Sequence, residues 1–552
     1  MFRKPVSRWS RRVPRVPHMR SLDESDSSSL NMSTANGSAH RDLTMGMYPW
    51  YVLSVLFLVY VINFLDRNIL SILAQDIKAD LGLGDAQLGF LFGTAFAIFY
   101  AMFGIPLGRL ADSWYRGRLI AAGLAVWSTM TALSGLAASY GQLAFARVGV
   151  GIGEASASPA AYSLIADYFP ARRRALAYAL YSSGLYVGAG LCLPLGGWVA
   201  HTWTRAYPHG YAPFGLAGWQ AAFLAVGLPG LLLALWVLTL REPARGLADG
   251  HPVPVRKSGA WRGFVLELGA ILPPFTLWSV SRFPGSLRTN LLLLATVSGA
   301  AAMLTRLTHD GAQWIGLGIG LYAVGSWMQM LRATDRPTFA LLFRQRAVVL
   351  ALVGFGATAF ISYSLGFWMA PYVIRTFGVR ADVAGFMLGV PQAFASAAGC
   401  AVGGYLSDAW KRRDPRGRLF VVMLASILPG PLLIVALQAA TVRTVYLINP
   451  LLAFTALLWV GSAVATIQDC VLPRMRGTAG AIFLLSVSIL GLALGPYSIG
   501  KVAALTGSLR TGMMSLLGVM PASLLLLWVA SRGIEVAEES RSARARAAGE
   551  NA

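Results

Sequence analysis

Four charged residues stand out because they lie within long apolar stretches: Asp66, Arg67, Arg147 and Glu154. A charged side chain at the centre of a membrane-spanning helix costs about 2.5–3.5 kcal/mol on insertion scales. Charges retained there usually serve ion or proton transfer, substrate binding, or pairing with one another. Two positive and two negative charges sum to zero, so the set favours mutual pairing.

Their depths along the expected helices place these residues in one layer. Asp66 lies about 12 Å from the outer end of its helix, Arg147 about 8 Å and Glu154 about 18 Å from the outer end of theirs. Arg147 and Glu154 are two turns apart and share a helix face. We predict a proton-coupling and substrate site in which Asp66 or Glu154 carries the proton, and Arg67 and Arg147 contact an anionic group. The alternative is a static ion-pair network that only locks helix packing.

The elements that must position this site are membrane helices. The chain has 552 residues, of which 56% are hydrophobic and 13% charged, whereas about 25% are charged in an average soluble domain. A helix needs about 20 mostly apolar residues to cross a bilayer. The sequence therefore predicts an all-α integral membrane protein with two sets of six spans. The spans are 48–74, 87–107, 119–138, 142–166, 175–200 and 219–240, then 347–373, 383–404, 419–439, 445–467, 478–499 and 511–530.

Two further spans are predicted between the sets, at Thr289–Leu304 and Ala312–Leu331. A third apolar block, Phe264–Trp278, contains Pro273-Pro274 and predicts an interfacial or broken helix. An odd number of inserted spans would move the basic cluster Lys411–Arg413 to the outer side. We therefore expect 14 spans, arranged as six, two and six.

The expected organisation has five parts. They are a disordered basic cytoplasmic tail (1–45), a first six-helix half (46–245), a central region with two inserted helices (246–346), a second six-helix half (347–532) and a short cytoplasmic tail (533–552).

The net charge of +22 does not indicate nucleic-acid binding, because the basic residues form short clusters between apolar blocks. Clusters such as Arg172–Arg174 and Lys411–Arg413 fall on one side of the expected membrane, as cytoplasmic loops do. This predicts a multi-pass protein of a bacterial inner membrane with both termini in the cytoplasm. Cys192, Cys400 and Cys470 show no metal spacing, so no metal or cofactor is expected. The sequence contains no P-loop for ATP and no catalytic motif, which argues against an enzyme.

A repeated segment relates the two sets. Residues 108–116 read GRLADSWYR and residues 404–412 read GYLSDAWKR. A second pair, Asp167 and Asp469, follows the fourth span of each set at a similar offset. Such repeats indicate two parallel six-helix halves.

The repeat predicts a gating motif made of Gly108, Asp112, Arg116, Gly404, Asp408 and Arg412. Asp112 ends a helix, where the dipole disfavours a negative charge. We expect it to pair with Arg116 or with a helix N-terminus of the other half, in a contact that breaks when the access state changes. The alternative role is a purely topological anchor of loop charges.

These loops resemble the signature cytoplasmic motif of the major facilitator superfamily, with Tyr115 where glycine is usual. Within that superfamily the sequence resembles the Spinster-like branch. The matching stretches are 64–67 (FLDR), 77–83 (IKADLGL), 146–155 (ARVGVGIGEA), 165–170 (IADYFP) and 241–243 (REP). The resemblance is strong over 48–245 and weaker over 345–530, and the inserted pair departs from the twelve-span pattern. It implies proton-linked export of lysolipids, sphingoid phosphates or related amphiphiles.

Tyr363, Trp368 and Asn449 are candidates for lining a substrate cavity. Together these features predict a secondary active, proton-coupled transporter that moves a small organic or lysolipid-like solute by alternating access, with protons and membrane lipid as partners. An organic-anion or sugar-acid symporter is one alternative. A ligand sensor with a transporter fold, which binds without turnover, is another.

Overall fold

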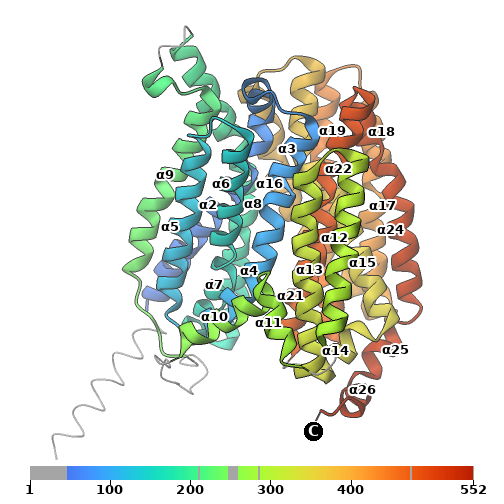
Figure 1. Ribbon diagram of the computed structural model, residues 1–552. Helices are drawn as coiled ribbons and strands as arrows, with labels where there is room; N and C mark the ends of the chain where they lie inside the picture. The colour runs from blue at the N-terminus through green and yellow to red at the C-terminus, as the bar shows by residue number, and fades with distance from the viewer. Residues whose placement is uncertain (1–45, 209–211, 246–258, 284–285, 473–474, 551–552) are drawn as a thin grey trace, which may run out of the picture.

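The computed structural model describes residues 46–208, 212–245, 259–283, 286–472 and 475–550. The expected tail 1–45 lies outside the described residues. Figure 1 shows two bundles of long helices side by side, with α12 and α13 standing in front of the second bundle.

The first bundle contains the first six predicted spans. Its elements are α2 (Tyr48–Leu81), α3 (Asp85–Phe92), α4 (Thr94–Ser113), α5 (Arg116–Ser134), α6 (Tyr140–Glu154), α7 (Ala157–Tyr168), α8 (Ala171–Ala206), η1 (Pro213–Gly215) and α9 (Gly218–Leu238). The second span is divided into α3 and α4, and the fourth into α6 and α7. Helix α2 runs seven residues beyond the expected end at residue 74. It ends only at Gly82, which caps the helix in the left-handed region with a φ of 62°.

The central region forms α10 (Ala260–Ile271), α11 (Phe275–Ser281), α12 (Ser286–Thr308), α13 (Gly311–Thr334) and α14 (Arg336–Phe343). Helices α10 and α11 are bent by 97° relative to each other, as expected of a broken helix at Pro273-Pro274. A buried polar chain joins α11, α12 and α13: the Thr276 hydroxyl lies 3.1 Å from the Tyr322 hydroxyl, which donates to Asn290 at 2.7 Å.

The second bundle contains the last six predicted spans. Its elements are α15 (Arg346–Phe377), α16 (Ala381–Lys411), α17 (Gly417–Ile427), α18 (Pro429–Gln438), α19 (Val442–Ala456), α20 (Trp459–Asp469), α21 (Arg476–Ser486), the π-helix η4 (Val487–Ala493), α22 (Gly495–Thr506), α23 (Leu509–Met514) and α24 (Leu516–Ser531). The expected C-terminal tail contains two short helices, α25 (Ile534–Glu539) and α26 (Arg541–Ala547), and α26 packs against α14.

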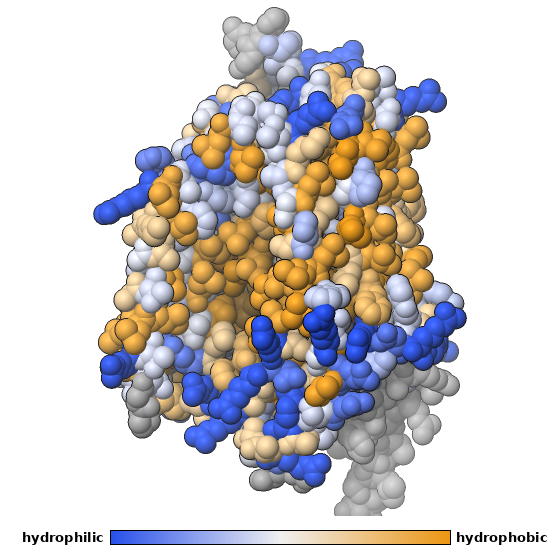
Figure 2. Space-filling view, turned by 90° about the vertical axis from the view of Figure 1, so that its right-hand side faces the viewer, coloured by the Kyte–Doolittle hydropathy of each residue, from blue (hydrophilic) through white to orange (hydrophobic). Residues whose placement is uncertain are grey.

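Among the described residues, eleven helical segments are long and apolar enough to cross a membrane, or twelve if bent α10 and α11 count as one. The other three predicted spans are helical but fall below that test: α5, the α6–α7 pair and α13. The count of 14 therefore stays a prediction. Figure 2 shows hydrophobic side chains over the middle of the molecule, with hydrophilic ones gathered toward its two ends, as expected of a surface that faces lipid.

We call the end that carries α10, α14, α25 and α26 the inner end, and the opposite one the outer end (Figure 1). The two halves pack closely toward the outer end, through α8 against α16 and α3 against α22. Small residues make this possible: a Cβ at Gly385 would stand 2.3 Å from the Leu193 carbonyl oxygen, and one at Gly500 2.2 Å from that of Asp85. The outer end is therefore closed.

Candidate functional site

An ion pair between α2 and α6 lies at the centre of the candidate site. The Arg67 guanidinium donates to Oε2 of Glu154 from Nε at 3.1 Å and from Nη2 at 2.6 Å. The Glu154 side chain is 0% exposed and that of Arg67 is 9% exposed. The expected pairing is thus found for these two residues, and Arg67 keeps slight access to the space around it.

Aromatic rings surround the Arg67 charge. The guanidinium carbon lies 4.6 Å from the ring centre of Phe64, 4.5 Å from that of Phe96 and 4.9 Å from that of Tyr100. Rings at these distances attract a cation through their electron-rich faces. Tyr363 of the second half is close enough to interact electrostatically with Arg67. Sequence reasoning missed the three rings, although the i, i+3 spacing of Phe64 and Arg67 on one helix could have found the first.

Arg147 is fully buried and contacts backbone instead of a carboxylate. Its Nη1 and Nη2 donate to the carbonyls of Asp66 and Arg67, each at 3.2 Å, and Nε lies 3.4 Å from that of Leu91. No ion pair of Arg147 occurs within the described part of the chain, so the expected full pairing of four charges is wrong for this residue. The reason is the direction of α2, whose backbone and not its Asp66 side chain faces Arg147.

The Asp66 carboxyl group faces α5. Neither of its oxygens has a hydrogen-bond partner in the part of the chain that the structure describes, and the residue is 0% exposed. Trp127 and Thr131 of α5 are among its polar neighbours. Consecutive helix residues point about 100° apart, so Asp66 turns toward α5 while Arg67 turns toward α6. The four residues do share one level, but they form one ion pair, one backbone-bound cation and one unpartnered acid.

Close helix packing places Glu154. The residue ends α6, and two glycines before it let α6 approach its neighbours. A Cβ at Gly151 would stand 2.5 Å from the Phe96 carbonyl oxygen, and one at Gly153 2.7 Å from the Trp127 nitrogen. Any larger residue would push α6 away from α4 and α5. The GVGIGE sequence therefore brings the carboxylate against Arg67.

The first copy of the repeated motif forms a buried cluster at the inner end. Arg116 is 0% exposed and pairs with Asp167 and with Glu242, the latter at 2.7 Å. The expected contact between Asp112 and Arg116 is wrong: among the described residues Asp112 makes no ion pair, and the basic residues around it include Arg245. Extended backbone at Trp114 separates α4 from α5, so Arg116 points away from the end of α4.

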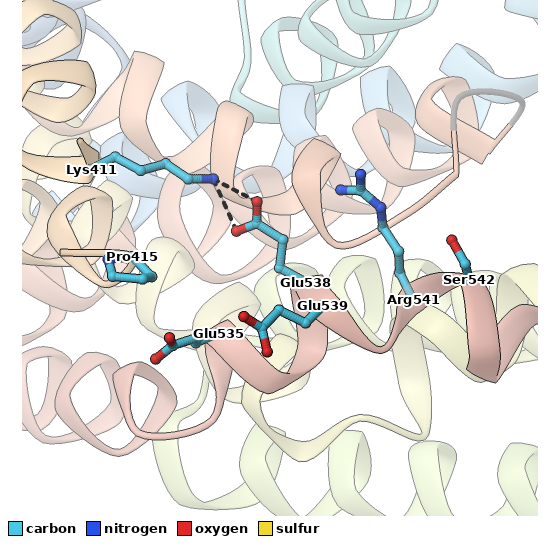
Figure 3. Close-up of a pocket in the computed structure, with 7 residues that line it drawn as sticks. All are labelled: Lys411, Pro415, Glu535, Glu538, Glu539, Arg541 and Ser542. Carbon is cyan, nitrogen blue, oxygen red and sulfur yellow. Dashed lines mark hydrogen bonds and ion pairs between the residues drawn. The ribbon is translucent and has the colours of Figure 1, made fainter. Parts of the chain in front are cut away.

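The second copy forms a more open cluster, and Figure 3 shows Lys411 of this copy beside the C-terminal helices α25 and α26. Lys411 binds Asp469. It also binds Glu538, at 2.8 Å, in the contact drawn in Figure 3. Arg418, and not the expected Arg412, is the arginine of this copy that binds acids: it pairs with Asp469 and lies 3.4 Å from Asp408.

A difference in loop length explains the wrong assignment of Arg412. Nine positions separate Asp408 from Gly417, but five separate Asp112 from Gly117. A match without gaps therefore selected Arg412, whereas alignment of the two glycines places Arg416 opposite Arg116 and Arg418 opposite Arg118. Arg412 and Arg416 are both exposed. The two motif glycines make no close contact that requires glycine, since a Cβ would meet only Pro159, at 3.9 Å, from Gly108 and nothing from Gly404.

Comparison with known proteins identifies the family. Residues 56–496 match the Major Facilitator Superfamily. The chain belongs to this superfamily. It is 28% identical over 469 residues to an MFS-type efflux pump of Mycolicibacterium smegmatis, covering 84% of this chain and 86% of the pump. It is 30% identical to Protein spinster of Drosophila melanogaster over 208 residues, which cover 38% of this chain and 32% of that protein.

Solved structures agree with this assignment. A bacterial homologue of the human lysosomal transporter Spinster, in an inward-facing and unoccupied conformation, has a TM-score of 0.63 and 26% identity, covering 90% of this chain and 98% of that one. The same homologue in an occupied conformation gives 0.61. The Spinster-like resemblance is thus confirmed, and the chain is a multi-pass membrane transporter of this superfamily rather than an enzyme.

The outer closure of this transporter includes an ion pair that sequence reasoning missed. Arg375 at the end of α15 donates through two nitrogens, each at 2.8 Å, to the two carboxylate oxygens of Asp85 at the start of α3. Lys78 binds the same carboxylate at 2.5 Å. A two-bond arginine–carboxylate contact between the halves adds orientation as well as attraction. It must break if the outer end opens.

The three cavity candidates occupy different places. Tyr363 is half-buried near Arg67, and its role as a lining residue stays a prediction. Trp368 is fully buried in the outer closure, where its indole nitrogen donates to the Pro496 carbonyl at 2.9 Å. The Asn449 amide nitrogen lies 3.5 Å from Gln392 of α16. Trp368 and Asn449 therefore fill helix seams in this conformation, contrary to the expectation for them.

Proposed function

We propose that this transporter is proton-coupled and moves a small organic solute with an anionic group. The substrate class that we favour is an amphipathic, lysolipid-like solute. The observation that carries the proposal is the buried, unpartnered Asp66 carboxyl group beside the Arg67–Glu154 ion pair. An acid without partners and a paired acid in one layer provide two distinct places for a proton.

Asp66 holds the proton in the conformation described. An ionised carboxylate that is buried without a hydrogen bond or counterion is very costly, whereas a neutral acid costs far less. The guanidinium of Arg147 lies 3.2 Å from the Asp66 carbonyl oxygen. A side-chain rotation that brings Arg147 to the carboxylate would stabilise the ionised form and release the proton.

Arg67 is the group suited to bind the anionic part of the substrate. It is the one of the four residues whose side chain retains slight exposure next to a residue of the second half, Tyr363. An incoming anion competes with Glu154 for the guanidinium. Glu154, once displaced in a buried setting, takes up a proton, and this exchange links substrate binding to proton movement.

The aromatic rings around Arg67 favour a substrate with an apolar portion, since their faces and edges provide apolar contact area next to the charge. The Spinster-like relationship supports an amphiphile. The alternative is a sugar acid: the Probable galactarate/D-glucarate transporter GudP of Bacillus subtilis is 32% identical over 203 residues, 36% of this chain and 41% of that protein. Both classes carry the anion that Arg67 requires.

We also propose that the inner end faces the cytoplasm of a bacterial cell, with both termini on that side. The basic residues of both motif copies lie where α4 and α16 end and where α5 and α17 begin, among them Arg109, Arg118, Arg412 and Arg418. Such residues are retained on the cytoplasmic side of the inner membrane.

The test uses purified protein in liposomes that contain a pH-sensitive dye. A lysophospholipid and a sugar acid are added separately, to wild type and to Glu154→Gln and Asp66→Asn. The matched control is Glu539→Gln, which removes an exposed carboxylate of α25 far from the site. We expect proton flux driven by the lysophospholipid, at wild-type level in the control and reduced at least about tenfold in both site variants.

Flux driven by the sugar acid alone would assign the alternative substrate class. Binding without flux of any kind would contradict transport coupling and favour a ligand sensor. Undiminished flux in both site variants would reject the proposed proton site.

A further inference from the structure

We infer that the inserted hairpin, formed by α12, α13 and their connection, is a latch that holds the outer end of the transporter closed. Helix α13 packs against α4, and the tip of the hairpin contacts α22; Figure 1 shows the hairpin in front of the second bundle. Helix α4 belongs to the first half and α22 to the second, so the hairpin lies across a seam that must open during transport. The inference rests on the transport function proposed above, carried out by the alternating access predicted from the sequence.

The hairpin packs along the first half through α13 and α4. A Cβ at Gly320 would stand 2.7 Å from Cδ1 of Ile98, and one at Gly316 3.4 Å from Cγ2 of Thr94. At the inner end, α10 also contacts α4, where Glu267 of α10 pairs with Arg109 of α4. These contacts extend over several turns of α4.

The tip of the hairpin is attached to the second half by polar contacts. The Asp310 carboxylate accepts from Lys501 and from the Tyr497 hydroxyl of α22, each at 2.8 Å. The ring of Trp314 meets that of Tyr497 edge-on, with centres 5.6 Å apart. His309 has a φ of 61°, a left-handed conformation unusual for a residue with a side chain. The strained reversal at His309 directs Asp310 toward α22.

One buried residue of the hairpin touches both halves. The Gln313 side-chain oxygen lies 2.6 Å from the Thr94 hydroxyl of α4. The same hydroxyl lies 2.8 Å from the Ala493 carbonyl, at the end of the π-helix η4, and the Gln313 amide nitrogen lies 3.5 Å from that carbonyl. The first half, the second half and the hairpin thus all meet at this position.

Opening of the outer end separates α3 and α4 from α22, and the hairpin cannot remain bound to both. The buried polar chain between α11, α12 and α13 makes the hairpin a preassembled unit. Its longer contact with α4 keeps it on the first half, so the contacts of Asp310, Gln313 and Trp314 with the second half are the ones that break. Contacts made in one state only shift the equilibrium toward that state.

The experiment measures the distance between the outer ends of the two halves without substrate or proton gradient, so it does not depend on proton coupling or substrate identity. Spin labels are attached at Ala138→Cys and Ala504→Cys, two exposed positions at the outer end, in the full chain with its native cysteines replaced by alanine. Distance distributions in lipid bilayers then give the ratio of outer-open to outer-closed molecules for each variant.

We expect Asp310→Asn to raise that ratio about fivefold, and Asp310→Asn with Gln313→Ala to raise it more than about tenfold. The matched control is Thr296→Val on α12, since Thr296 is exposed and bonds only within its own helix. Lys501→Met should raise the ratio as Asp310→Asn does, with no further rise when both are combined, because they remove the same contact.

A ratio within twofold of wild type in the Asp310 and Gln313 variants, with the control also unchanged, would overturn the latch. An equal rise in the Thr296 control would overturn it too, since any disturbance of the hairpin would then suffice.

Discussion

The two halves share a fold but differ in the polar groups that they bury between their helices. In the first half, α2 and α5 enclose the Asp66 carboxyl group, and α2 and α6 the Arg67–Glu154 pair. In the second half, α15, α17 and α24, which correspond in chain order to α2, α5 and α9, meet at three hydroxyl groups. These belong to Thr358, Ser426 and Ser523 and lie 2.7–3.1 Å apart. All three are 0% exposed.

This difference separates two tasks. A neutral hydroxyl cluster satisfies its own hydrogen bonds and fixes helix packing, and it does not change with protonation. The first half holds ionisable groups whose partners can be exchanged. The halves therefore contribute unequally: the first half carries the proposed proton and anion chemistry, and the second provides a neutral surface that closes over it.

The two motif copies at the inner end also differ, because the basic residues that pair with acids are more buried in the first copy than in the second. Arg116 of the first copy is 0% exposed, whereas Lys411 and Arg418 of the second are 23% and 16% exposed. Water screens an exposed pair, so its loss costs little, while a buried charge depends on its partners.

The largest expected effect tests this contrast of the motif copies. Arg116→Met removes a buried partner shared by two carboxylates, and we expect a loss of about 3–5 kcal/mol in the free energy of unfolding. Lys411→Met, in the open cluster, should cost about 1 kcal/mol or less. Denaturant unfolding of both variants in the same detergent measures the difference. Equal losses would mean that burial does not distinguish the copies.

A smaller effect tests the hydroxyl cluster. Thr358→Val keeps the side-chain shape and removes one of three hydroxyls, while Ser426 and Ser523 remain 3.1 Å apart. We expect a loss of about 0.6 kcal/mol, the average for hydrogen bonds between membrane helices, and no more than about 1.7 kcal/mol, the largest such value. The transport rate should stay within twofold of wild type. A transport defect without a stability loss would instead assign this cluster a part in the chemistry.

Much of this architecture was predictable from sequence because apolar length, charge clusters and the repeated motif are local signals. All twelve spans of the two halves were found as helices, and so was the inserted pair. Asp66, Arg67, Arg147 and Glu154 were found as a group, since charges within apolar stretches are visible without a structure.

Their partners were not predictable, because they depend on helix rotation and on contacts between distant segments. Sequence spacing cannot tell that Arg147 faces the backbone of α2 or that Asp66 faces α5. The pair Arg375–Asp85 joins residues 290 positions apart. The assignment of Arg412 failed for a simpler reason, an uneven loop length. The bridging position of the inserted hairpin has no local signal at all.

The smallest expected effect decides whether the first half stores a proton at rest. If Asp66 is neutral, Asp66→Asn replaces one uncharged group with another of nearly the same shape, and the free energy of unfolding should change by less than about 1 kcal/mol at neutral pH. If Asp66 were ionised, the same variant would remove an unpartnered buried charge and stabilise the protein by several kcal/mol. Glu154→Gln is the comparison within the same site, and it should cost about 1–3 kcal/mol because Arg67 loses its counterion. A marked gain in stability for Asp66→Asn would therefore show that Asp66 is ionised at rest. The first half would then not store a proton at this residue.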